Sequence, residues 1–203
     1  MTQNWNELRL CLEKKGYTVH ILESAEAVKV YLLETISPTA TVGIGGSITV
    51  RQTGVDQALT QRGNPVHWHW TAEPGEVAQA RYLANGAQVY LTSTNAITAK
   101  GQLVNIDGFG NRVAAMAYGP GKVFVIVGQN KLCPDLESAM ERVKQVACPQ
   151  NARRLGLDTP CAHTGKCVDC ASPQRFCNAT LILDRCPGSH PIEILLVSDD
   201  LGY

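Results

Sequence analysis

The sequence has no excess of charge of either sign and no long apolar run. Its 203 residues include 18 Lys and Arg and 18 Asp and Glu, for a formal net charge of zero. A protein that binds nucleic acid needs a basic face, so this balance argues against such a partner. No run approaches the ~18 apolar residues of a membrane-spanning helix. The start of the chain lacks the basic and apolar segments of a secretory signal. We therefore expect a cytoplasmic protein without a membrane span.

Cysteine, by contrast, is abundant and clustered. The chain has eight cysteines, and five of them lie between positions 161 and 186. In a reducing compartment, clustered cysteines more often bind a metal or do redox chemistry than form disulfides. Residues 161–177 read CAHTGKCVDCASPQRFC, in which one short CxxC lets two thiolates reach one centre. The predicted metal ligands are Cys161, Cys167, Cys170 and Cys177.

The spacing of these cysteines leaves the bound group open. Thiolates bind iron–sulfur clusters and zinc alike. Structural zinc sites often use two CxxC-like pairs, and only one is present here. Iron–sulfur ligation tolerates the irregular spacing better, so we expect an iron–sulfur cluster of the [4Fe-4S] type, with zinc as the alternative. A thiol–disulfide or purely structural site is the third reading. Cys186 either joins the site or packs, and Cys11, Cys133 and Cys148 are expected to pack.

The apolar pattern predicts the fold class. Strand-like runs alternate with helix-like stretches, which is typical of an α/β protein with a mostly parallel, Rossmann-like sheet and helices on both faces. We expect strands at 17–22, 41–44, 65–70, 88–92, 103–106, 122–127, 179–183 and 192–197. We expect helices at 3–15, 24–34, 48–61, 74–85, 111–118 and 135–146. A single domain over 1–203 is predicted, with 158–178 as a Cys-rich, metal-binding loop near the C-terminus.

A glycine-rich turn follows the strand predicted at 41–44, in the sequence TVGIGGSIT. Glycine lets a bound anion approach the backbone, and the start of the next helix supplies amide groups. The candidate anion-binding residues of this turn are Gly45, Gly46, Ser47 and Thr49. The turn matches neither a Walker A loop nor the dinucleotide fingerprint. The alternative is a tight strand-to-helix turn without a ligand.

Polar residues also crowd two later strand ends, in the sequences STNAIT and NIDGFGNR. Asp107 is a candidate general base, and Arg112 is a candidate for bidentate binding of a carboxylate. Asn95 and Asn111 are expected to orient the same ligand. The alternative is Asx-turn chemistry at glycine-rich turns. Because such residues recur at three loops of one sheet, we favour a shared pocket for a small anionic metabolite.

One histidine pair stands apart from these segments. His67 and His69 lie two positions apart, so a continuous strand would place them on one face, with Trp68 and Trp70 on the other. No third metal ligand is evident beside the two histidines. We therefore expect packing rather than a metal site.

Two segments of the chain resemble the LUD-domain (lactate-utilisation) family. They are GIGGSIT and, downstream of it, STNAITAKGQLVNIDGFGNRVAAMAYGPGKVFVIVGQNKLCPDLESAMERV. The later TPCAHTGKCVDCASPQRFCN resembles the cysteine-rich tail of one branch of that family. The resemblance covers nearly the whole chain. It implies a fold similar to the sugar-phosphate isomerase and CoA-transferase superfamily. In that pattern, Gly45, Gly46 and Ser47 match an anion-binding loop, and 105–112 lies where members place pocket residues.

The resemblance also implies a function. Related proteins are linked with the oxidation of L-lactate to pyruvate, beside partner subunits that carry iron–sulfur clusters. It therefore favours an iron–sulfur oxidoreductase, or a subunit of one, for lactate or a small 2-hydroxy acid, and it hints at a homo-oligomer. One alternative is a non-redox isomerase or transferase for a small anionic metabolite, with a structural zinc or cluster site. The other is a sensor of iron or redox state.

Overall fold

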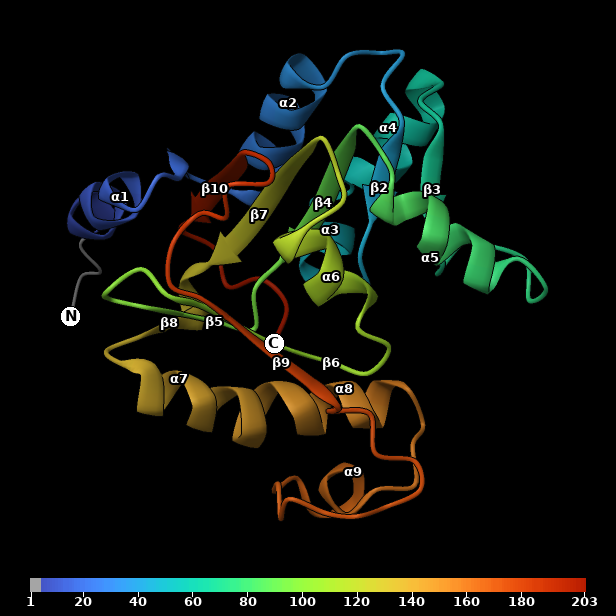
Figure 1. Cartoon of the computed structure of the whole chain (residues 1–203), viewed down its shortest axis with the longest axis vertical. Helices are drawn as coiled ribbons and strands as arrows, with labels where there is room; N and C mark the ends of the chain where they lie inside the picture. Colours follow the sequence, from blue (N-terminus) through green and yellow to red (C-terminus); the bar gives the residue numbers. More distant parts are fainter. Residues whose placement is uncertain (1–4) are drawn as a thin grey trace.

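The chain folds around two sheets in the computed structural model, which describes residues 5–203 (Figure 1). The larger sheet is parallel, with strands in the order β1-β10-β7-β4-β2-β3. These strands are β1 (Thr18–Leu22), β2 (Val42–Ile44), β3 (Val66–Trp68), β4 (Val89–Ser93), β7 (Lys122–Gly128) and β10 (Ile192–Val197). The smaller, mixed sheet has the order β8-β5-β6-β9. Its strands are β5 (Ala96–Thr98), β6 (Leu103–Asp107), β8 (Leu132–Cys133) and β9 (Ala179–Leu183).

The helices connect and cover these strands. They are α1 (Trp5–Lys14), α2 (Ala25–Thr35), α3 (Ile48–Thr53), α4 (Val55–Arg62), α5 (Val77–Asn85), α6 (Asn111–Ala117), α7 (Leu136–Arg142), α8 (Cys148–Arg154) and α9 (Pro160–Thr164). A 3₁₀ turn, η1 (Gln129–Lys131), follows β7, and a π-helical turn, η2 (Val143–Ala147), joins α7 to α8. No helix in residues 5–203 has the length and apolar character needed to cross a membrane.

The larger sheet is buried on both faces, as its apolar strands predict. On β7, Val123, Val125 and Val127 join the core that α1, α5 and α6 cover. The alternate residues Phe124 and Ile126 join the core that α2, α3 and α4 cover. The prediction of an α/β fold with a mostly parallel sheet and helices on both faces is therefore confirmed.

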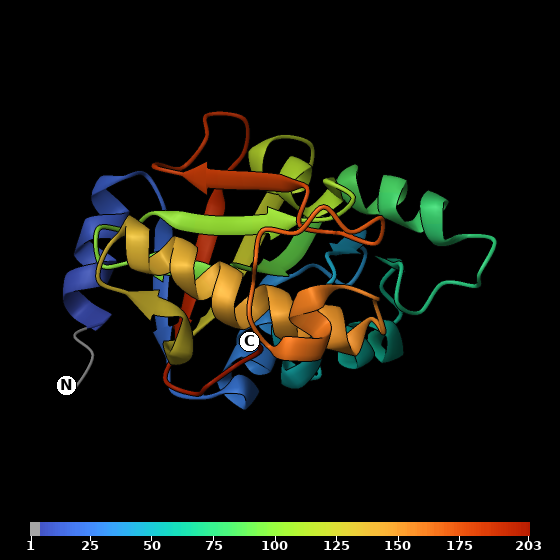
Figure 2. The same cartoon turned by 90° about the horizontal axis from the view of Figure 1, so that it is seen from below.

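The smaller sheet was not foreseen as a separate layer. One face of it contributes Ile97, Leu103 and Leu183 to the core beside α1. The other face packs against the helical segment from α7 to α8, which crosses it in Figure 2. The last two strands of the chain belong to different sheets. Strand β9 pairs with β6 in the smaller sheet, whereas β10 lies between β1 and β7 in the larger one. Both are short apolar runs, and sequence alone does not assign such runs to different sheets.

Several predicted boundaries shift for local reasons. The strand expected over 65–70 ends at Trp68. The helix expected over 48–61 is interrupted at Gly54, whose φ of 68° is left-handed. The helix expected to end near 146 continues to Arg154, because Pro149 lies at the start of α8, where its missing N–H costs least. The first helix was expected from residue 3, which lies outside the described residues.

Candidate functional site

An open cavity of about 540 Å³ lies at the carboxyl ends of β2, β4 and β7, facing α8 and the last residues of the chain. Ligand sites in parallel α/β sheets are typically found at this edge. Most of the predicted pocket residues line it: Gly46, Ser47, Thr49, Asn95, Asp107, Asn111 and Arg112. Gly45 lies behind the wall, where an added Cβ would be 2.9 Å from the Tyr90 hydroxyl and 3.3 Å from Cγ of Arg112. The fold thus brings three separate loops together, and what they bind stays a prediction.

Arg112 is held so that part of its guanidinium remains available. Its Nη2 donates to Asn95 Oδ1 at 3.0 Å and to the Ile106 carbonyl. Asn95 Oδ1 also accepts from the Ile106 N–H at 2.9 Å, so this amide fixes both the strand end and the arginine. The Nε and Nη1 groups of Arg112 bond to no residue in the described part of the chain. An arginine fixed at one nitrogen and free at the others suits binding of a carboxylate.

The side chains of Asp107 and Ser47 both accept hydrogen bonds from backbone N–H groups at the start of a helix. Asp107 Oδ2 accepts from the backbone N–H groups of Arg112 at 2.9 Å and Val113 at 3.3 Å. Its Oδ1 accepts from the Gly108 N–H at 3.1 Å, so the carboxylate caps the start of α6. Ser47 Oγ likewise accepts from the Val50 N–H at 3.2 Å and caps α3. The roles of Asp107 as a base and Ser47 as an anion ligand remain predictions.

Lys131 is a cavity residue that the sequence analysis missed. It lies in the turn η1, is 2% exposed, and lines the cavity. Its Nζ donates to Thr49 Oγ1 and to Ser93 Oγ, both at 2.6 Å. Burial holds the pKa of Lys131 well below its ordinary value, and the charges of Arg142 and Arg112 lower it further. A lysine just after a strand is normally expected in solvent, so no sequence signal marked it.

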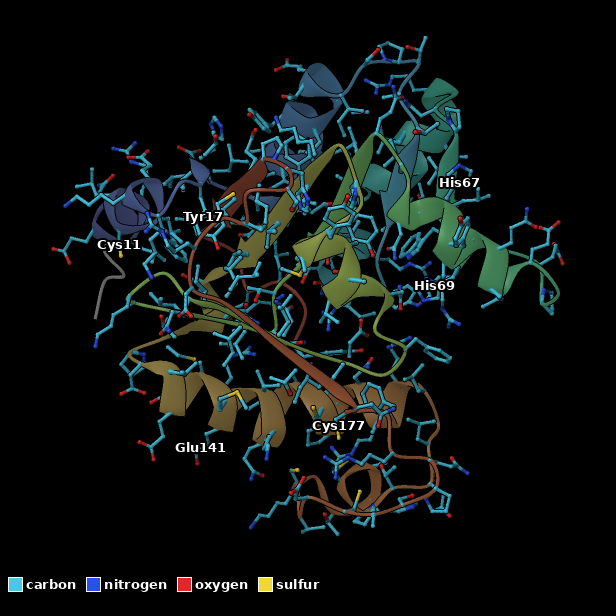
Figure 3. The ribbon with its side chains drawn as sticks, in the orientation of Figure 1. Cys11, Tyr17, His67, His69, Glu141 and Cys177 are labelled. Carbon is cyan, nitrogen blue, oxygen red and sulfur yellow. The ribbon has the colours of Figure 1, made fainter. Side chains whose placement is uncertain are left out.

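His69 also lines the cavity, whereas His67 does not (Figure 3). Because β3 ends at Trp68, the two histidines do not share one strand, and the rings of Trp68 and Trp70 stack with centroids 5.0 Å apart. Burial lowers the pKa of His69 to about 4; the charge of Arg81 adds to this and that of Asp107 opposes it. Its Nδ1 is buried and has no hydrogen-bond partner in residues 5–203. His69 therefore presents a neutral imidazole to the cavity wall, with its Nδ1 turned away from the open space.

The charge around the cavity is strongly one-sided. Four basic side chains line it, three of them arginines: Arg81, Arg112, Lys131 and Arg154. None of them is paired with a carboxylate in the described residues. The one acidic residue in the walls is the capping Asp107. Arg112 is buried without a carboxylate partner in the described residues, whereas Arg81 is half-buried and Arg154 is exposed.

A second, smaller cavity of about 20 Å³ gathers the predicted metal ligands. Cys161, Cys167, Cys170 and Cys177 all line it, and so does Cys148 from α8. We expect Cys148 only to pack, and it does belong to the core cluster between the smaller sheet and the helical segment from α7 to α8. Cys177, labelled in Figure 3, packs against this cluster. Cys186 lies elsewhere, against the core beside α1. All eight cysteines are free thiols.

Hydrogen bonds hold the walls of the cysteine cavity. Arg175 donates from Nη1 to the Cys170 carbonyl at 2.7 Å and from Nε to the Cys177 carbonyl at 3.3 Å. Burial raises the pKa of Cys148 to about 12, and the neighbouring thiolates of the loop raise it as well. Within the residues the structure describes, no three His, Cys, Asp or Glu side chains are arranged to hold a metal ion. The thiols are thus gathered around one space without enclosing an ion.

The two cavities are neighbours with a common wall. Cys148 and Phe176 line both of them. Cys148 begins α8, and Phe176 lies directly before Cys177, so the wall joins the helix to the cysteine loop. A group bound among the cysteines would therefore lie beside a ligand in the larger cavity.

Fold and cavity together define an α/β protein of the Rossmann-like kind with a polar site at its strand ends. The LUD domain profile matches residues 6–197, so the chain belongs to the LUD domain family. A solved structure of a DUF162 family protein from Deinococcus radiodurans is similar, with a TM-score of 0.55 and 10% identity over 95% of each chain. At this identity the likeness shows the fold alone. No curated protein matches the chain.

Proposed function

We propose that this LUD-domain protein binds a small carboxylate metabolite in the larger cavity and an iron–sulfur cluster among the cysteines. In this proposal it acts as an oxidoreductase, or a subunit of one, on lactate or another small 2-hydroxy acid in the cytoplasm. The observation that carries the proposal is the wall shared through Cys148 and Phe176. It supports a redox group directly beside the bound metabolite, as electron transfer requires.

The spacing of the cysteines favours a cluster over a single zinc ion. Structural zinc sites often use two CxxC-like pairs, and residues 161–177 contain one. Iron–sulfur ligation tolerates this irregular spacing better, and five cysteines share one cavity. The cavity is small, so the loop must open to admit a cluster. Within 158–178 only Thr159 is buried, and this exposure leaves the loop free to do so.

The residues of the larger cavity would bind and orient the metabolite. The free nitrogens of Arg112 pair with the carboxylate, and Arg81 and Arg154 add positive charge at the wall. Neutral His69 lines the same cavity and would hydrogen-bond the hydroxyl group of the metabolite. The apolar ring of Phe176 excludes water on the side toward the cysteines.

A partner subunit follows from the electron count. Oxidation of a 2-hydroxy acid to a 2-oxo acid releases two electrons and two protons. A bound [4Fe-4S] cluster supplies transfer of one electron at a time. We therefore include in the proposal an electron acceptor on a second, iron–sulfur-carrying subunit.

The test is the metal and sulfide content of protein purified without oxygen. We expect iron and acid-labile sulfide in equal amounts and a brown protein with a broad visible band. Cys167→Ser should lose most of both, whereas Cys11→Ser should keep them, since Cys11 lies outside the cysteine cavity. A colourless protein that contains zinc alone would overturn the proposal.

A further inference from the structure

The amine of Lys131 is positioned by two hydroxyl groups that cannot donate to it. Ser93 Oγ gives its proton to the Ile126 carbonyl at 2.6 Å, and Thr49 Oγ1 gives its proton to the Leu201 carbonyl at 3.3 Å. Each hydroxyl has a single proton, so both accept from Lys131. Two N–H groups of the amine are thereby fixed by hydrogen bonds, and the nitrogen lone pair has no partner among the described residues.

No carboxylate compensates this amine in the described chain. Its direct partners are two hydroxyls, and the charged groups that act on it are the cations Arg112 and Arg142. Burial and neighbouring cations both disfavour the ammonium form, so the pKa of Lys131 falls. This environment is the one that makes a lysine amine nucleophilic at neutral pH.

A glycine lies between the amine and the cavity, so no side chain covers the amine there. Gly202 packs over Lys131 with a left-handed φ of 66°, and a Cβ at that position would lie 3.3 Å from Nζ. A side chain there would also clash with Thr49 Oγ1, so any other residue at 202 would close over the pair. Lys131, Gly202 and Arg112 all line the same cavity.

We propose that Lys131 is a nucleophile that condenses with the carbonyl group of a small 2-oxo acid whose carboxylate is bound by Arg112. A bond forms between Nζ and the carbonyl carbon, and the carbonyl oxygen leaves as water with the two amine protons. The product is an imine, and neither an oxidant nor a reductant is consumed. The carboxylate site rests on the proposed function; the covalent capture of a 2-oxo acid goes beyond it.

The test is reductive trapping on the intact protein. Pyruvate and sodium cyanoborohydride are added at pH 7, and the modified lysine is found by mass spectrometry of peptides. We expect a carboxyethyl group on Lys131 at more than ten times the occupancy on exposed Lys100. Lys131→Met should abolish this adduct, and Lys100→Met should leave it unchanged. Peptide mapping of the wild-type protein identifies the residue even if a variant fails to fold.

Two negative outcomes are distinguishable. If calorimetry detects pyruvate binding but labelling at Lys131 does not exceed that of Lys100, the nucleophile is ruled out and the carboxylate site stands. If pyruvate and L-lactate both fail to bind, the carboxylate site and the inference fall together, while the iron and sulfide content still reports on the cysteine site.

Discussion

The two cavities differ in how they are organised. The larger one takes its walls from strand ends, α8 and the chain terminus, and its side chains are fixed by bonds such as that of Arg112 to Asn95. The cysteine cavity takes four of its five thiols from one exposed segment. The first is thus fixed by side chains from several elements, whereas the second is built mainly from one exposed segment, where a bound group would add order. Each prediction below tests one side of this contrast.

The largest effect is expected from emptying the cysteine site. Removing the bound group by chelation, or changing Cys170→Ser, should raise the rate of proteolysis within 158–178 more than ten-fold, because the segment is exposed and ligation would tie its cysteines together. Residues 158–178 belong to neither core of the larger sheet, so the main thermal unfolding transition of the protein should persist. Limited proteolysis with Cys11→Ser as the control measures this. Equal cleavage rates would show that the loop is ordered without a ligand.

A large effect is also expected at the anion side of the larger cavity. Arg112→Gln removes charged hydrogen bonds to a carboxylate, each worth about 1.5–3 kcal/mol. Binding of L-lactate or pyruvate should weaken at least ten-fold by calorimetry. Arg185→Gln, at an exposed position, should bind as the wild type does. Unchanged affinity of the Arg112 variant would place the carboxylate elsewhere.

The next prediction concerns how the free energy of unfolding depends on pH because Lys131 is buried. Its pKa is lowered in the folded state, so unfolding takes up a proton at any pH between the folded and unfolded values. Wild-type stability relative to Lys131→Met should therefore be higher at pH 9.5 than at pH 7. Urea unfolding of both proteins at these two pH values measures the difference. Parallel pH profiles would show that the buried amine keeps its charge.

The smallest effect is expected from His69 under acid conditions. Its pKa of about 4 when folded lies below the ordinary value of 6.5, so the unfolded chain binds a proton first as the pH falls. Stability present above pH 6.5 should be lost progressively toward pH 4, by about 1 kcal/mol after allowance for its partial exposure. His69→Gln should flatten this part of the profile in thermal melts between pH 4.5 and 7. His67→Gln serves as the matched control, and an equal slope in both variants would contradict the prediction.

Local patterns predicted much of this protein. The alternation of apolar runs gave the α/β class, and the strand-end polar residues Asn95 and Arg112 lie on one cavity as expected. The second sheet was missed because β5 pairs with β8 and β9 pairs with β6, and these partners are distant in sequence, so no local pattern specifies them. The role of Asp107 could not be predicted from its sequence context, because an aspartate at a strand end suits either a general base or a helix cap. Its hydrogen bonds to three backbone N–H groups show the helix cap.

The sequence by itself determined the fold class, the family resemblance and the spacing of Cys161, Cys167, Cys170 and Cys177, because these depend on local periodicity and short-range chain geometry. Only the tertiary structure decided that Cys148 joins them and lines both cavities. It alone also decided that Lys131 is buried without a carboxylate partner among the described residues. Burial and charge pairing arise from segments that are distant in sequence, so they exist only once the chain has folded.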